Sequence, residues 1–145
     1  GVGSKNLPAR RDIFGETLTR DEGLVIGPFS PMKVSKDKKD IVFNEFVKIG
    51  YNPSVQSRYI RDIELTPKQY ENLLKIQKQL KTKQVIEKLI KNSNYLRLPD
   101  ELKKRTIDTL IQKNRETARN LLFRRDKDLQ NKYIKEQRKT IRQLR

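Results

Sequence analysis

The chain has no cysteine and no histidine among its 145 residues. Their absence excludes disulfides, a thiolate nucleophile, zinc sites of the usual types and histidine acid–base chemistry. The sequence also lacks a P-loop, a glycine-rich dinucleotide turn and a nucleophile elbow. We therefore expect no enzyme activity, no cofactor, no metal site and no small-molecule substrate.

Long apolar runs are missing as well. No window approaches 18 consecutive apolar residues, so no membrane span is expected. Hydrophobic residues make up 34% of the chain, against roughly 45–50% in an average globular protein. The core must be small. The chain opens Gly1-Val2-Gly3-Ser4, without an initiator Met or a signal-peptide core, as expected of an excised or processed piece.

Positive charge is abundant. The net charge is +16, and residues 99–145 alone hold 15 Lys/Arg against 7 Asp/Glu. Such a field favours polyanions, namely DNA, RNA, an anionic membrane surface or an acidic protein face. The alternative is a soluble Lys-rich protein whose charges only keep it dissolved.

The patterning predicts a mainly α fold. We expect a small helical bundle with an extended N-terminal arm, a candidate short strand pair and a long basic C-terminal helix. The predicted organisation is an extended arm over residues 1–39, a helical core over 40–123 and a basic helical tail over 124–145. The tail has widely spaced apolar residues among charges, so its helix is expected to need a partner or to fray.

Four helices are predicted within the core. They cover about Asp40–Ile49, Pro67–Leu80, Thr82–Lys91 and Pro99–Arg124. The second has the clearest start, because Thr66 and Gln69 form a capping box around Pro67. Thr82 is predicted to cap the third. The apolar residues expected to face the core are Ile41, Phe43, Phe46, Val47, Ile49, Tyr70, Leu73, Leu74, Ile76, Leu80, Val85, Ile86, Leu89, Ile90, Tyr95, Leu96, Leu98, Leu102, Ile107, Leu110, Ile111, Ala118, Leu121 and Leu122.

Two apolar stretches outside these helices are candidate strands. Leu24–Phe29 is bounded by turn signals, and within a stretch of mixed polarity Tyr59, Ile60, Ile63 and Leu65 indicate a brief extended segment. We predict that the two stretches pair with each other.

Two pairs of carboxylates are the weak candidates for chemistry. Asp62 and Glu64 would share one face of a strand, as groups for acid–base work or a metal do. They also precede a helix N-terminus, where acidic residues are favoured in any case. Asp126 and Asp128 lie in a basic run. We interpret all four as structural or solvated charges.

The basic C-terminal helices form the candidate binding surface. Lys103, Arg115 and Arg119 are predicted to project away from the apolar stripe of the longest helix, which suits contacts to phosphates. No base-reading motif accompanies them, so nucleic-acid binding is predicted to be non-specific and sensitive to salt. A solvated face with salt bridges is the alternative, and a membrane surface is disfavoured because Phe123 is the only aromatic in mid-helix. The predicted nucleic-acid-binding residues are Lys103, Lys104, Arg115, Arg119, Arg124, Arg125, Lys132, Arg138, Lys139 and Arg142.

Three short motifs carry a resemblance that spans nearly the whole chain. They are Leu7-Pro8-Ala9-Arg10-Arg11-Asp12-Ile13-Phe14-Gly15-Glu16, Ile63-Glu64-Leu65-Thr66-Pro67-Lys68-Gln69-Tyr70 and Tyr95-Leu96-Arg97-Leu98-Pro99-Asp100. Their order resembles the C-terminal region of the large virion-internal or ejected proteins of tailed bacteriophages, also called polyvalent proteins. That family shows an LP-x-R-x-D-x-x-G arm, an LTPEQY helix and a Y-x-x-LPD turn. The present chain is richer in Lys.

The resemblance implies a structural role without catalytic residues. It implies an internal, portal-associated or tail-associated virion protein that acts through assembly contacts and electrostatic contact with DNA. Its expected partners are copies of itself, other virion proteins and double-stranded DNA, and its expected location is the phage particle or the host cytoplasm during assembly. The alternative is a free-standing, non-specific nucleic-acid-binding or ribonucleoprotein component.

Overall fold

The computed structural model describes residues 11–16 and 40–144. Its elements in chain order are α2 (Ile41–Ile49), β1 (Tyr59–Ile60), β2 (Ile63–Glu64), α3 (Pro67–Gln79), α4 (Thr82–Ile90), α5 (Ser93–Leu96), α6 (Asp100–Arg125) and α7 (Lys127–Gln143). The predicted mainly helical fold with a long C-terminal helix is confirmed. Most of the predicted arm, residues 1–10 and 17–39, lies outside the described residues.

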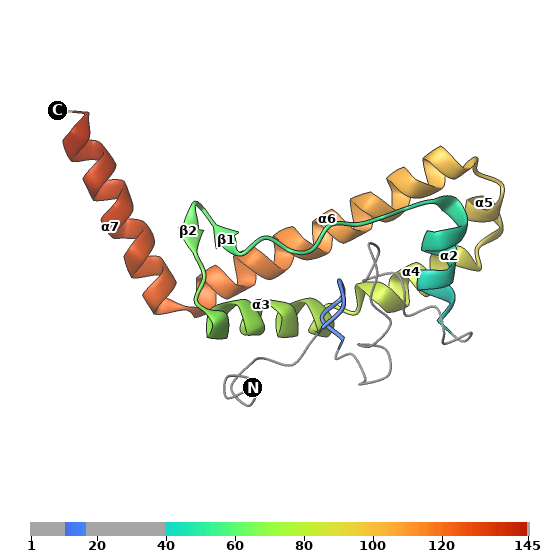
Figure 1. Ribbon diagram of the computed structural model, residues 1–145, viewed down its shortest axis with the longest axis horizontal. Helices are drawn as coiled ribbons and strands as arrows, with labels where there is room; N and C mark the ends of the chain where they lie inside the picture. The colour runs from blue at the N-terminus through green and yellow to red at the C-terminus, as the bar shows by residue number, and fades with distance from the viewer. Residues whose placement is uncertain (1–10, 17–39, 145) are drawn as a thin grey trace, which may run out of the picture.

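The long helix α6 is the central element of the fold, against which most of the other helices pack. In Figure 1 it runs along the upper edge of the body. The helices α3 and α4 follow one another beneath it, and α2 and α5 lie at the right-hand end. The helix α7 leaves the other end of the body at an angle and points away from it. The most extensive contact of α6 is with α3, and α2, α4 and α7 also pack on α6.

The predicted limits of the first two helices are close to those observed. Asp40 caps α2 by accepting a hydrogen bond from the Phe43 N–H, and Gly50 ends it with a φ of 74°. At α3, the Thr66 side chain and the Gln69 side chain form the predicted reciprocal capping box, and Pro67 occupies the first turn. Both starts follow from short-range hydrogen bonding, which sequence reveals directly.

The predicted cap of α4 is wrong. Lys81 stands at the N-cap with a φ of 56° and makes no side-chain capping bond. Thr82 is the first helical residue, and its hydroxyl instead accepts a hydrogen bond from the Asn114 amide of α6 at 2.7 Å. The connection from α3 is too tight to leave an extended residue for the cap.

The predicted strand from Tyr59 to Leu65 folds back on itself. Tyr59 pairs with Glu64 and Ile60 pairs with Ile63 in an antiparallel two-residue hairpin. Arg61 and Asp62 form its turn with φ values of 49° and 69°, as a type I′ turn requires. The predicted partner stretch, Leu24–Phe29, lies outside the described residues.

The core consists of two clusters of buried side chains. The first core cluster contains Ile13, Phe14, Val42, Phe43, Phe46, Ile49, Tyr51, Ile86, Tyr95, Ile107 and Ile111. The second core cluster contains Ile60, Ile63, Leu65, Leu73, Ile76, Ala118, Leu122 and Leu129. Because α6 supplies residues to both, it joins the two ends of the body.

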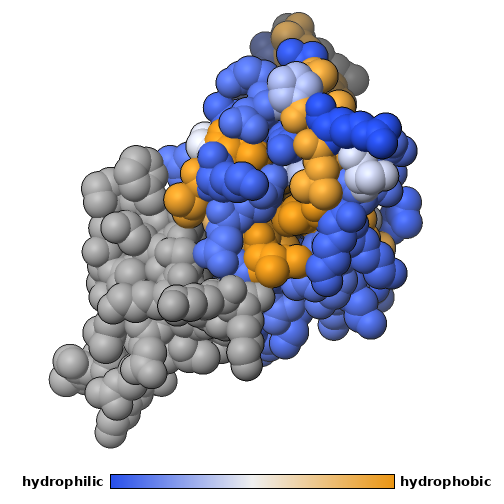
Figure 2. Space-filling view, turned by 90° about the vertical axis from the view of Figure 1, so that its right-hand side faces the viewer, coloured by the Kyte–Doolittle hydropathy of each residue, from blue (hydrophilic) through white to orange (hydrophobic). Residues whose placement is uncertain are grey.

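Four side chains predicted to face the core are exposed. Val47, Leu96 and Leu102 belong to α2, α5 and the start of α6, at the end of the molecule viewed in Figure 2, where apolar surface is visible between hydrophilic side chains. Val85 on α4 is 50% exposed. Each of these four side chains lies beyond the packed sides of its helix and therefore stays in solvent.

A short piece of the predicted arm belongs to the core. Ile13 and Phe14 are buried, with the Phe14 ring 5.8 Å from that of Phe43. Arg11 forms an ion pair of 2.7 Å with Glu71 of α3. Gly15 lies against the backbone of α3. The arm therefore contributes packing at residues 11–16 and is not simply extended there.

Candidate nucleic-acid interface

The ten predicted binding residues fall into groups with very different surroundings. Lys103 and Arg115 are only 8% and 4% exposed, so the prediction that they project outward is wrong. The Lys103 ammonium lies 5.4 Å from the centre of the Tyr95 ring. Arg115 donates to the backbone carbonyl and the hydroxyl of Ser54, and burial lowers the pKa of its guanidinium. Both residues hold the body together.

Two more of the predicted cations are engaged with neighbours on the body. Lys104 forms an ion pair of 3.1 Å with Glu101. Arg119 donates to the side-chain oxygen of Gln56 at 3.0 Å. The charged groups of both residues are thus engaged with side chains of the body.

The remaining cations gather at the end of α6 and along α7. Arg124 and Arg125 end α6 and are exposed, as are Arg138, Lys139 and Arg142 on α7. Lys135, which was not among the predicted binding residues, is exposed on α7 beside them. Lys132 is partly exposed and pairs with Asp128 at 3.2 Å. Because Lys135, Arg138, Lys139 and Arg142 follow the spacing i, i+3, i+4 and i+7, they project from one side of the helix.

The opposite side of α7 is apolar. Ile134, Ile141 and Leu144 lie there and are 46%, 53% and 83% exposed. At 100° per residue, all six Lys/Arg residues of the helix fall within an arc of about 140°, and no apolar residue shares that arc. The helix thus separates charge from apolar surface along its whole length.

The N-terminal turns of α7, which we call its root, are fixed to the body by a cap, a buried leucine and aromatic contacts. Asp126 caps the helix by accepting from the Leu129 N–H at 3.0 Å, and the Leu129 side chain is fully buried. The Tyr133 ring meets the Phe123 ring edge-on at 5.5 Å between centres. The Arg61 guanidinium stacks on Phe123 at 4.1 Å. The first two turns of α7 are therefore held, and the rest extends beyond the body.

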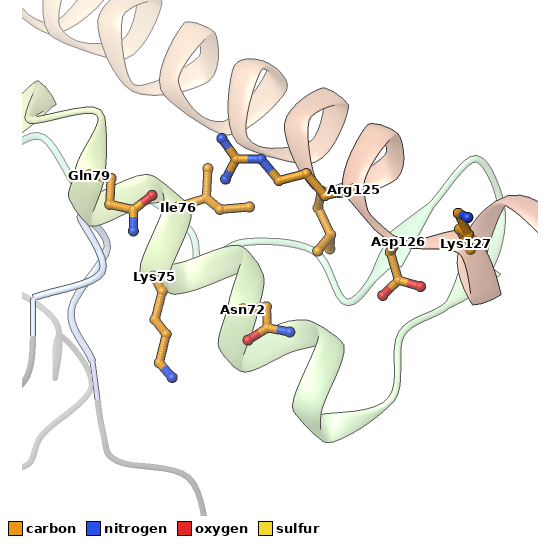
Figure 3. A pocket seen from close by; sticks show the side chains of 8 residues that line it. Asn72, Lys75, Ile76, Gln79, Arg125, Asp126 and Lys127 are labelled. Carbon is orange, nitrogen blue, oxygen red and sulfur yellow. The ribbon is translucent and has the colours of Figure 1, made fainter.

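A groove of about 520 Å³ lies beside the root of α7, between α3 and the junction of α6 and α7. In Figure 3, the Arg125 side chain reaches above Ile76 toward Gln79, and the Asn72 and Asp126 side chains point toward each other. Lys75 and Lys127 also line it. The sequence prediction omitted both lysines. Lys127 belongs to the basic run and was detectable, whereas Lys75 is brought there only by the packing of α3.

The four candidate carboxylates lie in different surroundings. Asp62 forms the hairpin turn, and Glu64 is exposed on β2. Asp126 and Asp128 both accept from the Gln69 amide at 3.2 Å. Within residues 11–16 and 40–144, no group of three or more Asp or Glu is placed to hold a metal ion.

Among the helices of the described part, none combines the length and apolar character needed to cross a membrane. No family model, no curated protein and no solved structure matches the chain. The fold and the site therefore define it only as a mainly helical protein with a projecting, basic, amphipathic C-terminal helix.

Proposed function

We propose that this chain is a non-enzymatic binding module that contacts double-stranded DNA through the cationic side of α7. The observation that carries the proposal is the segregation of charge on that helix. Lys135, Arg138, Lys139 and Arg142 are exposed together, on a helix that projects from the body. Of the four predicted binding residues on the body, by contrast, Lys103 and Arg115 are buried, and Lys104 and Arg119 bind neighbouring side chains.

The arrangement suits phosphate contacts better than base recognition. A row of flexible cations spaced along one helix side can follow a phosphate backbone without reading bases. The side of α7 that faces away from the cations carries aliphatic residues, which offer no hydrogen bonds to base edges. Binding is therefore expected to be insensitive to sequence and driven by the release of counterions.

The salt dependence of DNA affinity tests the proposal. We would titrate the full chain into a fluorescent duplex at several salt concentrations between about 50 and 300 mM. The triple variant Lys135→Gln, Arg138→Gln, Arg142→Gln removes three exposed cations. If each neutralises one phosphate, the slope of log affinity against log salt becomes shallower by about 2.7.

A matched control removes the same charge from the other end of the molecule. Lys48→Gln, Lys91→Gln, Arg97→Gln changes three exposed cations on α2, at the end of α4 and after α5. This variant is expected to keep the slope within about one unit of the wild-type value. If the slope became shallower by the same amount in both triple variants, net charge alone would attract DNA, and α7 would not be the interface.

We also propose that the module works inside the particle of a tailed bacteriophage, as the motif resemblance implies. The described parts of the three motifs lie where a helix starts or is contacted: residues 11–16 dock on α3, Thr66–Gln69 start α3, and Tyr95–Pro99 lead into α6. Mass-resolved light scattering tests the assembly role, for which a symmetric oligomer is expected. A monomer at all concentrations, binding DNA only at low salt, would favour the free-standing module instead.

A further inference from the structure

A second surface, unrelated to α7, lies between α4 and α6. Two hollows of about 510 and 180 Å³ open there, and both are lined by Val85 and Leu110. They form one groove that follows α6 from Arg105 to Thr117. At 1.5 Å per residue this length is about 18 Å, or a little over three turns of a helix.

The floor of the groove is apolar. Val85, Leu89 and Leu110 line it, and Val85 is 50% exposed. The hydroxyls of Thr106 and Thr109 donate to carbonyls of their own helix at 2.8 and 2.9 Å. Their hydrogen-bonding capacity is satisfied internally, so these residues need no polar partner in the groove.

The rim of the groove is positively charged. Arg105 and Lys113 line the hollows on the α6 side. On α4, Lys81 and Lys88 are exposed and flank Val85 at i−4 and i+3, which places them on its side of the helix. Among the residues that line the two hollows there is no carboxylate.

We propose that this groove binds an acidic amphipathic helix of a partner protein. Such a helix would insert aliphatic residues at i, i+3 or i+4 and i+7 between Val85 and Leu110. Its flanking Asp or Glu residues would meet the four rim cations, which supply electrostatic complementarity and orientation. A second copy of this chain fits poorly, because its exposed apolar helix α7 carries six Lys/Arg.

Binding of designed peptides by the full chain tests the proposal. The probe is a fluorescent helical peptide of about 18 residues with Leu at i, i+4, i+7 and i+11 and Glu on both flanks. One twin has Ser in place of Leu, and a second has Lys in place of Glu. Fluorescence anisotropy is expected to show at least a tenfold higher affinity for the probe than for either twin. Equal affinity for the probe and either twin overturns the proposal.

Variants of the groove locate the binding. Val85→Glu introduces a carboxylate at a half-exposed position and is expected to lower probe affinity at least tenfold, with an unchanged circular dichroism spectrum. Arg105→Glu, Lys113→Glu on the rim is expected to do the same. The α7 triple variant Lys135→Gln, Arg138→Gln, Arg142→Gln is expected to retain probe binding, which separates this proposal from the DNA interface. Unchanged affinity of Val85→Glu for the probe would overturn the proposal. Loss of self-association by Val85→Glu in light scattering would also overturn it, because the groove would then bind a second copy of the chain.

Discussion

Gly15 is the residue at which the N-terminal segment touches the backbone of α3. Its φ is +83°, and a Cβ there would lie 2.0 Å from the Leu74 carbonyl oxygen and 2.9 Å from the Lys78 nitrogen. Neither atom can move without distorting the helix. We expect Gly15→Ala to release residues 11–16 and to lower the free energy of unfolding by at least about 2 kcal/mol, measured by urea denaturation.

Gly50 provides the matched control for this substitution. Its φ is +74°, but the atoms nearest to an added Cβ are the Lys104 side-chain carbon and nitrogen at 3.7 Å. Gly50→Ala therefore pays only the left-handed backbone cost of about 1 kcal/mol. If the two alanine variants were equally stable, close approach to α3 would not explain Gly15.

Asp12 makes the stability of the molecule depend on pH. Its carboxylate accepts from the Phe14 and Glu16 N–H groups at 2.8 and 3.0 Å. Burial nevertheless raises the pKa of Asp12 to about 6, against the opposing effects of those bonds and of Lys83. The folded state thus binds the proton more tightly than the unfolded chain. This stabilisation is complete below about pH 4 and is lost as the pH rises through about 6.

Comparison with Asp12→Asn isolates that dependence. The amide keeps an acceptor for the two backbone N–H groups but does not titrate. Between about pH 4 and 7 the wild type is expected to lose on the order of 1–3 kcal/mol relative to the variant, measured by urea denaturation at each pH. A difference that stays constant with pH would contradict the raised pKa.

Single residues also show where sequence patterns stop being informative. Caps at Asp40 and Thr66 depend on neighbours within three residues and were predictable. Arg115 was assigned to the outer side of α6 because helical phase was counted from one apolar stripe. In the fold, residues 51–56 cover a second side of α6, and Ser54 and Gln56 bind Arg115 and Arg119. That α6 has a second covered side can be seen only from the path of this loop in the folded structure.

The element that matters most for the proposed function is α7, and its order depends on its root. Leu129 is fully buried in the second core cluster, whereas the distal turns are exposed. An isolated helix of this length is marginal in water. We expect Leu129→Ala to remove the anchor at a cost of about 2–4 kcal/mol in docking and to reduce the far-UV helical signal. Hydrogen exchange should quicken in α7.

Leu144→Ala at the C-cap of the same helix is the control, because that side chain is 83% exposed and its loss should leave the spectrum unchanged. If Leu129→Ala retained full helicity and slow exchange, α7 would be stable by itself. The sequence predicted a tail that frays or needs a partner. In the fold its first two turns have a partner within the chain, namely Phe123 and the Arg61 hairpin turn.

Over the whole molecule, the sequence predicted one helical core but not its division into two clusters. Periodicity identifies which residues are apolar along a helix and cannot say which other helix covers them. The boundary between the clusters falls on α6 between Ile111 and Ala118, and on α3 beyond Ile76. Both boundary positions are polar and buried: Asn114 is 5% exposed and Gln77 is 1% exposed.

Asn114 and Gln77 join the clusters through a buried hydrogen-bond network. The Gln77 amide donates to the Asn114 side-chain oxygen at 2.9 Å and to the Ile13 carbonyl at 3.2 Å. The Asn114 amide donates to the Gln77 carbonyl at 3.3 Å and to the Thr82 hydroxyl at 2.7 Å. One asparagine thus links α3, α4 and α6, and Gln77 extends the link to the docked segment.

Asn114→Leu keeps a similar volume and leaves these polar partners unpaired in the interior. We expect it to lower the free energy of unfolding by about 2–4 kcal/mol and the melting temperature by roughly 6–12 °C. Because the network joins the two clusters, the calorimetric transition should also broaden or split. Gln112→Leu on the exposed side of α6 should change the melting temperature by less than about 2 °C. A sharp, unshifted transition in Asn114→Leu would mean that apolar packing along α6 alone couples the two ends of the body.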